Sequence, residues 1–237
     1  MSITFTNLGA SANPDLDEFR NQTSYSNSSW TPPTSGLICL FVATREASGA
    51  NGPPTVTGNS LTWTQIATVT FEVGDWRITL FAADATGSST GATTADYGSD
   101  TQLHCNMFFC QVTGVDLSSG VAGAFVQSQT AEDSGTPATS GSVTLSSFAS
   151  SDNRPLACFW HGATETITVE AGWTQLDAFT GTGASRGGAS MYRDDSSDLT
   201  PSASWSTSTD WGGIAVELKA EAAAAAGQFM TTNRGYW

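Results

Sequence analysis

The stretch Leu61-Thr62-Trp63-Thr64-Gln65-Ile66 returns 110 residues later as Ala171-Gly172-Trp173-Thr174-Gln175-Leu176. The offset between matching segments falls from about 119 to about 106 residues along the chain, which is what loops of different length between repeated strands produce. We therefore interpret the sequence as internally duplicated. The segments that return in the same order are apolar or aromatic runs, namely residues 37–42, 76–81 and 106–112 in the first half and 156–160, 189–192 and 213–218 in the second.

The composition is that of a globular protein with few charges. Of the 237 residues, 39% are hydrophobic and 13% are charged, and the formal net charge is −14. Such an apolar content is enough for a folded core. A nucleic-acid-binding protein needs a basic surface to replace phosphate counterions, so we expect no nucleic-acid partner. The negative charge also opposes binding to an anionic membrane surface, and no run approaches the ~18 apolar residues of a membrane span.

The N-terminal residues and the cysteines indicate synthesis in a cytoplasm. Residues 1–8 contain neither the basic nor the apolar part of a signal peptide. Cys39 and Cys158 occupy matching places in the two repeats, which favours a core role for both, with a disulfide as the alternative. Cys105 and Cys110 are an odd number of residues apart, so they face opposite sides of a straight strand.

Short runs rich in β-branched and aromatic residues predict β-strands through most of the chain. Residues 71–78 predict a hairpin with the two-residue turn Gly74-Asp75. No amphipathic helix is predicted before residue 215. Alternating strands at this spacing indicate an all-β sandwich or barrel. Besides the repeated segments, strands are predicted at residues 68–73, 120–129 and 142–148 and from residue 167.

The duplication allows two domains or one. Each half offers about four or five strands, which is few for an independent sandwich, and no linker separates the halves. We therefore predict a single jelly-roll-like β-sandwich built from two interleaved, internally duplicated halves, each supplying strands to both sheets. The expected division is an N-terminal strand and polar arm (1–34), a sandwich (35–219) and a short Ala-rich helix with a tail (220–237). Within the sandwich we expect half one at about 35–116, bridging strands at 117–150 and half two at about 151–219.

No motif indicates an enzyme. Residues 183–187 match the Gly-x-Ser-x-Gly nucleophile elbow, but a strand follows them instead of a helix, so we interpret them as a glycine-rich hairpin loop. His104 and His161 lie at the edges of apolar strands without the partners of a triad or a metal site, and we expect structural or surface roles. Glu165 and Glu170 are an odd number of residues apart on a predicted strand, so they face opposite sides and do not form a glycosidase pair.

Two groups of carboxylates, at residues 15–18 and 194–198, offer oxygen ligands. Neither has the spacing of a calcium loop that ends in a distal Glu, and a bound cation at either group is the alternative. We therefore expect no catalytic residue, no metal site and no cofactor.

Aromatic residues are the most abundant candidates for recognition. The chain has eight Trp, twelve Phe and four Tyr. An exposed flat ring can stack on a sugar, whereas most rings of an all-β protein pack in its core. Trp205 lies in the polar run 202–207, so it is the tryptophan that we expect to be exposed and the candidate for sugar stacking.

The C-terminus differs from the rest of the chain. The alanine-rich residues 220–226 are the strongest helix-forming segment, and Gly227 is a natural stop. Residues 228–237 contain four large apolar or aromatic side chains, which a free polar tail avoids. We interpret them as a docking tail that packs on another subunit or protein, with packing on the protein's own sandwich as the alternative. The residues expected to make this contact are Phe229, Met230, Arg234, Tyr236 and Trp237.

Together these features resemble virion structural proteins of tailed bacteriophages, namely jelly-roll decoration, head-fibre or tail-associated proteins. The resemblance covers about residues 35–219 and rests on the two repeat copies and on Ile214-Ala215-Val216-Glu217-Leu218-Lys219-Ala220. It implies a non-enzymatic virion protein, such as a capsid decoration, that is made in the host cytoplasm. Its partners would be copies of itself and a major capsid or tail protein. A carbohydrate-binding adhesin module that binds a glycan through exposed aromatic rings is the second hypothesis, and a glycan-cleaving enzyme is a distant third.

Overall fold

The computed structural model describes residues 2–9, 16–47, 52–72, 75–133, 135–181 and 186–222. Within these residues the protein is all-β, as predicted, and its helical structure is short, including the single turn α2 (Gly120–Gly123). No helix of the described part is long and apolar enough to cross a membrane.

The strands form two large and two small antiparallel sheets. The first large sheet has the order β1 (Thr4–Asn7), β9 (Gln102–Thr113), β4 (Leu37–Glu46), β7 (Trp76–Asp84) and β6 (Thr64–Phe71), and β2 (Leu16–Gln22) also pairs with β9. The second has the order β10 (Phe125–Glu132), β17 (Trp211–Leu218), β12 (Arg154–His161), β15 (Gly187–Tyr192) and β14 (Thr174–Thr180). The small sheets are β3 (Ser24–Ser26), β8 (Thr93–Asp96) and β5 (Thr55–Gly58), and β11 (Ala138–Ser142), β16 (Ser202–Thr209) and β13 (Thr168–Val169).

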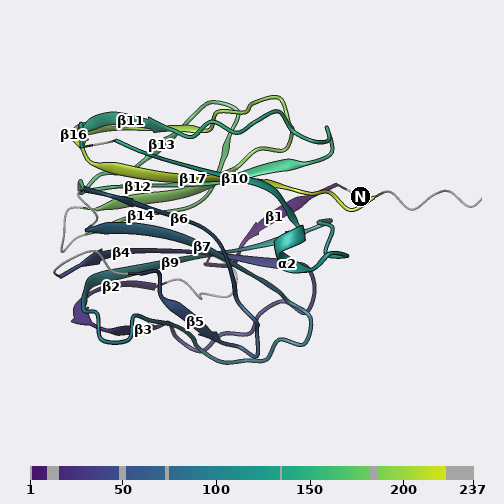
Figure 1. Ribbon diagram of the computed structural model, residues 1–237, viewed down its shortest axis with the longest axis horizontal. Coiled ribbons are helices and arrows are strands. Elements are labelled where there is room, and N and C mark those ends of the chain that lie inside the picture. The colour runs from purple at the N-terminus through teal and green to yellow at the C-terminus, as the bar shows by residue number, and fades with distance from the viewer. Residues whose placement is uncertain are drawn as a thin grey trace, which may run out of the picture.

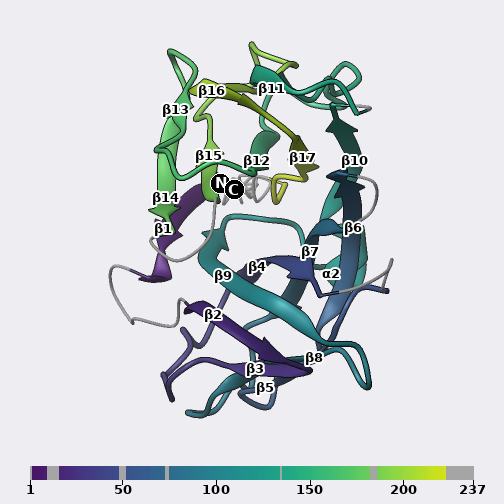
Figure 2. The same cartoon turned by 90° about the vertical axis from the view of Figure 1, so that its left-hand side faces the viewer.

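The four sheets stack as layers, with the large sheets in the middle and a small sheet at each end (Figure 1). Figure 2 shows β3, β5 and β8 at one end of the molecule and β11, β13 and β16 at the other. One buried apolar cluster fills the space between the two large sheets, and a separate cluster lies under each small sheet. The large sheets are therefore buried on both faces.

Burial on both faces explains why the central strands are continuous apolar runs. In β4, Leu37, Cys39 and Phe41 contribute to the cluster between the large sheets. Ile38 and Leu40, which alternate with them, contribute to the cluster under the first small sheet. Because successive side chains of a strand point to opposite faces, a strand between two cores needs apolar residues at every position.

The two halves of the chain have the same strand order. The order β9-β4-β7-β6 in the first large sheet corresponds to β17-β12-β15-β14 in the second, so each strand corresponds to the one eight places later in the chain. The small sheets β3-β8-β5 and β11-β16-β13 correspond in the same way. The described sheets do not mix strands of the two halves, so the interleaved sandwich that we expected is wrong. Strands from the expected arm and bridging segment complete each half: β3 pairs with β8, and β10 pairs with β17.

The halves pack face to face through the large sheets, with the strand order of one reversed over the other. The edge strand β6 lies beside β10, and the opposite edge strand β1 lies beside β14. At the second edge Phe5 stacks on Tyr192 with ring centroids 4.5 Å apart. In the interior the His104 ring is parallel to that of Trp160, with centroids 5.9 Å apart. The halves thus share one continuous core.

The repeated tryptophan segment marks the same local structure twice. Trp63 and Trp173 precede β6 and β14, and each packs in the cluster under its own small sheet. The ladder with the next strand then shifts register at Ile66 and at Leu176, which are the last residues of the repeat. Such a β-bulge places one extra residue in an edge strand and bends it. The two tryptophans are therefore packing residues.

Several predicted strand boundaries need correction. The segments predicted at 61–66 and 68–73 contribute to the single strand β6, which pairs with β7 from Thr64 to Phe71 on both sides of the bulge at Ile66. The segment predicted at 120–129 divides into α2 and β10, and β11 ends at Ser142, where a strand was expected to begin. In the predicted hairpin the last pair is Phe71 with Trp76, so the turn is longer than two residues.

Candidate docking site

The last described residues of the chain are held along the segment that joins the two halves. Ala220 forms a β-bridge with Val115, so it does not begin the helix that we predicted there. The Glu221 amide donates a hydrogen bond to the Gly114 carbonyl at 2.9 Å, and the Asp116 amide donates to the Lys219 carbonyl at 2.9 Å. Residues 219–221, the exit segment, therefore have fixed positions.

Lys219 adds a charge contact to the exit segment. Its ammonium lies 2.8 Å from a carboxylate oxygen of Asp116. Hydrogen bonds from Lys219 and Ser118 hold the pKa of the Asp116 carboxyl well below its usual value, so this carboxylate stays charged. The Lys219 amide also donates to the Ala124 carbonyl at 2.8 Å, which ties the exit segment to the residue that follows α2.

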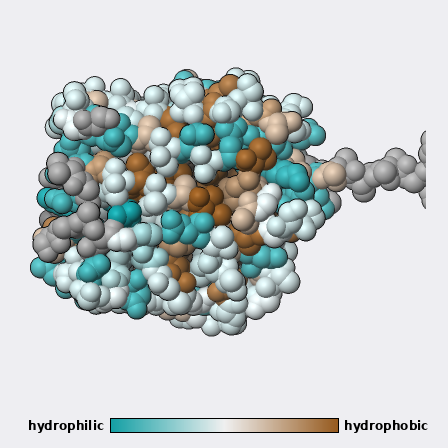
Figure 3. All heavy atoms as spheres, viewed as in Figure 1, coloured by the Kyte–Doolittle hydropathy of each residue, from teal (hydrophilic) through white to brown (hydrophobic). Residues whose placement is uncertain are grey.

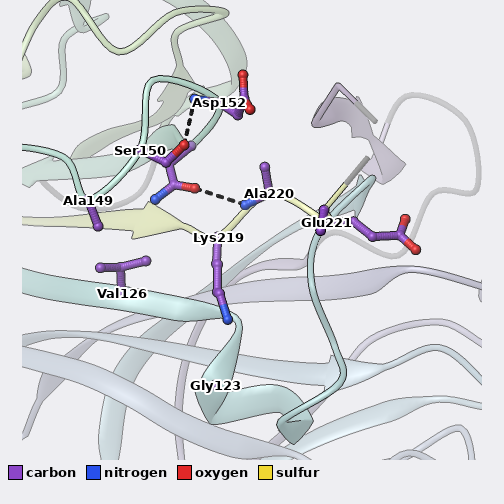
Figure 4. Close-up of a pocket in the computed structure, with 10 residues that line it drawn as sticks. Gly123, Val126, Ala149, Ser150, Asp152, Lys219, Ala220 and Glu221 are labelled. Carbon is purple, nitrogen blue, oxygen red and sulfur yellow. Dashed lines mark hydrogen bonds between the residues drawn. The ribbon is translucent and has the colours of Figure 1, made fainter. Parts of the chain in front are cut away.

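A buried polar network fixes the exit segment from the other side. Glu217 is fully buried, and its Oε1 accepts hydrogen bonds from the Ala149 amide at 2.8 Å and from Asn153 Nδ2 at 2.5 Å. Its Oε2 accepts a hydrogen bond from Gln127 Nε2 at 2.6 Å. Asn153 Oδ1 in turn accepts the Ala220 amide at 3.0 Å (Figure 4). A buried carboxylate whose oxygens are all bonded is a rigid support for the backbone beside it.

An open recess of about 510 Å³ lies beside the exit segment. Figure 4 shows Val126, Ala149 and Ala220 around it, with the Lys219 side chain extending toward α2. Most of its wall is formed by small or apolar side chains, and carboxylates of two residues stand at its rim. We call this site the exit recess; its lining residues are Gly123, Val126, Ala149, Ser150, Asp152, Asn153, Lys219, Ala220, Glu221 and Ala222.

Val126 is the most informative residue of the exit recess. It is a large apolar side chain with 41% of its surface exposed. The register of β10 with β17 shifts between Phe125 and Gln127, so Val126 is the extra residue of a β-bulge. Bulges at sheet edges turn a side chain out of the regular alternation. The sequence alone does not reveal this, because the pattern of residues 125–129 is also compatible with a regular strand.

The predicted tail residues lie outside the described part of the chain. These are Phe229, Met230, Arg234, Tyr236 and Trp237. The exit recess includes Ala222, the last described residue before them.

The expectation of an exposed Trp205 is wrong. Its side chain is 7% exposed, its indole donates a hydrogen bond to the Ala138 carbonyl at 2.9 Å, and its ring stacks on His161 with centroids 4.8 Å apart. The residues around it are polar because β16 alternates, with Ala203 and Trp205 facing the core and Ser204 and Ser206 facing solvent. A period of two in a serine-rich run is the signal that could have located this tryptophan in the core.

The candidate carboxylates stabilise loops. Asp198 accepts the Trp173 indole N–H at 2.8 Å, and Asp195 pairs with Arg193 at 2.7 Å. Glu165 accepts the Ser206 amide at 2.6 Å, and its hydrogen bonds with Ser206 and Thr207 lower the pKa of Glu165 to about 2. The described residues include no group of three or more His, Cys, Asp or Glu side chains that could hold a metal ion. The side chains at 15–18 and residues 182–185 of the glycine-rich loop lie outside the described part.

The histidines and cysteines are buried. Burial lowers the pKa of His104 to about 3 and that of His161 to about 4, so both rings are neutral at physiological pH. All four thiols are free. Cys105 lies in the core under the first small sheet and Cys110 in the core between the halves, on opposite faces of β9 as predicted.

Comparison of the chain with protein-family models, with curated proteins and with solved structures finds no match. The fold and the exit recess are therefore the basis for the function proposed below.

Proposed function

We propose that this protein is a non-enzymatic structural protein of a virion, such as a capsid decoration or another surface or assembly component. It would act through contacts with copies of itself and with a major capsid or tail protein. The observation that carries this proposal is the exit segment: backbone hydrogen bonds hold residues 219–221 beside an open recess lined mostly by small or apolar side chains, shortly before the aromatic residues 228–237 in the sequence. An exit segment that is held by hydrogen bonds suits a C-terminal tail that binds another protein.

The arrangement of the sheets supports a jelly-roll interpretation of each half. Along the first half, β3, β5 and β8 belong to the small sheet, while β4, β6, β7 and β9 belong to the large one. Strands that cross repeatedly between two sheets are typical of jelly rolls, which occur in viral capsid proteins and lectins. The shared strand order and the repeated tryptophan segment also favour duplication of one ancestral sandwich. This support is an analogy at the level of the fold.

The proposal is tested by removing the tail. A variant without residues 228–237 should keep the circular dichroism spectrum and melting temperature of the full chain, because the exit segment and the cores are intact. It should no longer sediment with the particles of the native source. As a matched control, the pair Thr231→Ala and Thr232→Ala changes the tail without removing its aromatic side chains and should still sediment. Normal incorporation of the truncated protein would show that the tail is not the attachment.

The carbohydrate-binding alternative retains one observation. A shallow recess of about 440 Å³ on the outer sheet is lined by hydroxyl groups, the Glu165 carboxylate and the edge of Trp205. Because the Trp205 ring is buried against His161, it does not offer a face for stacking. A glycan array that shows binding by the native protein and loss of binding in Ser204→Ala, which removes an exposed hydroxyl of this recess and should leave the melting curve unchanged, would favour this alternative.

A further inference from the structure

We propose that the exit recess is the receptor for the aromatic tail of a second copy of this chain, so that two copies exchange residues 228–237. This inference rests on the proposed function, which assigns the tail to docking, and it adds the partner and the site. Three observations carry it: the exposed bulge residue Val126, the charges of the recess and tail, and the position of Ala222.

Val126 is an exposed apolar side chain on a strand whose other exposed residues are polar. Its neighbours Ser128, Gln129 and Thr130 on the same edge strand are exposed polar residues. An isolated edge strand is normally protected by such residues, and a bulge interrupts its pairing. The bulge at Val126 instead presents an apolar side chain to the recess, opposite Ala149 and Ala220 (Figure 4).

The apolar surface continues beyond the exit recess. Half-buried Val121, Phe125 and Ile66 come from α2, β10 and the neighbouring edge of β6. Figure 3 shows apolar side chains gathered across the middle of this face. An aromatic peptide of several residues therefore finds apolar contacts both in the recess and next to it.

The charges of the recess and the tail are complementary. The charged lining residues of the exit recess are Asp152, Glu221 and Lys219, and the Lys219 ammonium is already paired with Asp116, which lies outside the lining. Residues 223–237 carry the cation Arg234 and no Asp or Glu, although the whole chain has a formal charge of −14. A tail without carboxylates is the part of this chain that a second acidic copy repels least.

The position of Ala222, the last described residue, is compatible with exchange between two copies. Ala222 lines the exit recess, so in each copy the start of the tail and the receptor are adjacent. A two-fold axis beside this point brings two starts and two receptors together, and the same contact forms twice in a closed dimer. An extended residue spans about 3.3 Å, so residues 223–228 can cross up to about 20 Å to a neighbour.

The experiment measures the molar mass in solution by light scattering over a dilution series. The full chain should be a dimer, and both the variant without residues 228–237 and Val126→Asp should be monomers. Thr130→Asp is the matched control, because it places the same charge on an exposed position of β10 outside the recess, and it should remain a dimer. A mixture of the truncated chain and Val126→Asp should form mixed dimers that are weaker than the native dimer, because only one of the two contacts, between the intact recess and the intact tail, can form.

A peptide with the sequence of residues 228–237 provides a second measurement that does not depend on the folding of a variant. It should bind saturably to the truncated chain and compete with dimer formation by the full chain. A full chain that is monomeric at every concentration, or a truncated chain that remains dimeric, overturns the exchange. If the full chain is monomeric but the tail is still needed for incorporation into particles, the proposed function stands, and the receptor of the tail is another protein of the particle instead of the exit recess.

Discussion

At the scale of single residues, His161 shows how burial turns a titratable side chain into a packing element. Its ring stacks on Trp205, and its Nδ1 accepts the Ala163 amide at 3.1 Å. Burial lowers the pKa of His161 to about 4 from its ordinary 6.5. Above pH 6.5 the ring is neutral in both the folded and the unfolded chain, so pH has no effect on stability through this residue.

The consequence is a loss of stability in mild acid. Between pH 6.5 and about 4 the unfolded chain binds a proton at His161 that the folded chain excludes, so the free energy of unfolding falls as pH falls, by up to about 1.4 kcal/mol per pH unit. His161→Asn keeps an acceptor for the Ala163 amide and cannot titrate. From pH 7 to pH 5 its melting temperature should fall less than that of the native protein. Equal slopes for the two proteins would show that folding does not lower the pKa of His161.

Trp205 shows which residues could be predicted from the sequence and which could not. A polar run around a tryptophan suggested exposure, but the alternation of Ala203 and Trp205 with serines is that of a strand with one buried face. Cys105 and Cys110 were placed correctly on opposite faces because strand periodicity alone decides that question. The bulge at Val126 follows from the pairing of β10 with β17, which no local pattern contains.

At the scale of elements, the glycines of β17 allow the two large sheets to approach each other. A Cβ on Gly212 would lie 2.5 Å from Cδ1 of Phe71, which belongs to β6 of the other half. Gly212 therefore leaves the space that the Phe71 ring occupies between the halves. Adding even one carbon to a close-packed core forces side chains from their preferred positions.

Gly212→Ala should accordingly reduce the free energy of unfolding by about 1–3 kcal/mol, measured by denaturant titration. Gly91→Ala is the matched control, because a Cβ there would meet its nearest atom at 3.7 Å, an ordinary contact. A Gly212→Ala protein as stable as the control would mean that the packing of β17 on β6 is looser than described.

The elements differ in how well they could be predicted. The strands β4, β7, β9, β12 and β17 were expected because apolar runs flank the repeat. The strands β3, β8 and β11 were missed, since they are short and rich in Ser and Thr and expose one face to solvent. Without them each half seemed too thin to fold alone, which led to the interleaved arrangement. With them, each half covers the outer face of its own large sheet.

At the scale of the whole molecule, the two halves have the same strand order and pack face to face on one shared core. Where the two halves correspond, features occur twice, as at Trp63 and Trp173. The exit segment follows β17 and pairs with residues 114–116, which follow the corresponding strand β9. The tail was identified from its aromatic residues, but the recess beside it requires the pairing of distant segments and could not be predicted.

The central claim, that this protein is a structural component of a virion, is tested most directly by immunogold electron microscopy of particles from the native source. Antibodies against the all-β body should label the particle surface in a regular pattern on the capsid, tail or fibre. Purified particles should carry the full chain in a fixed ratio to the major capsid protein. Particles that are unlabelled and free of this chain, while the protein accumulates elsewhere in the same preparation, would contradict the claim.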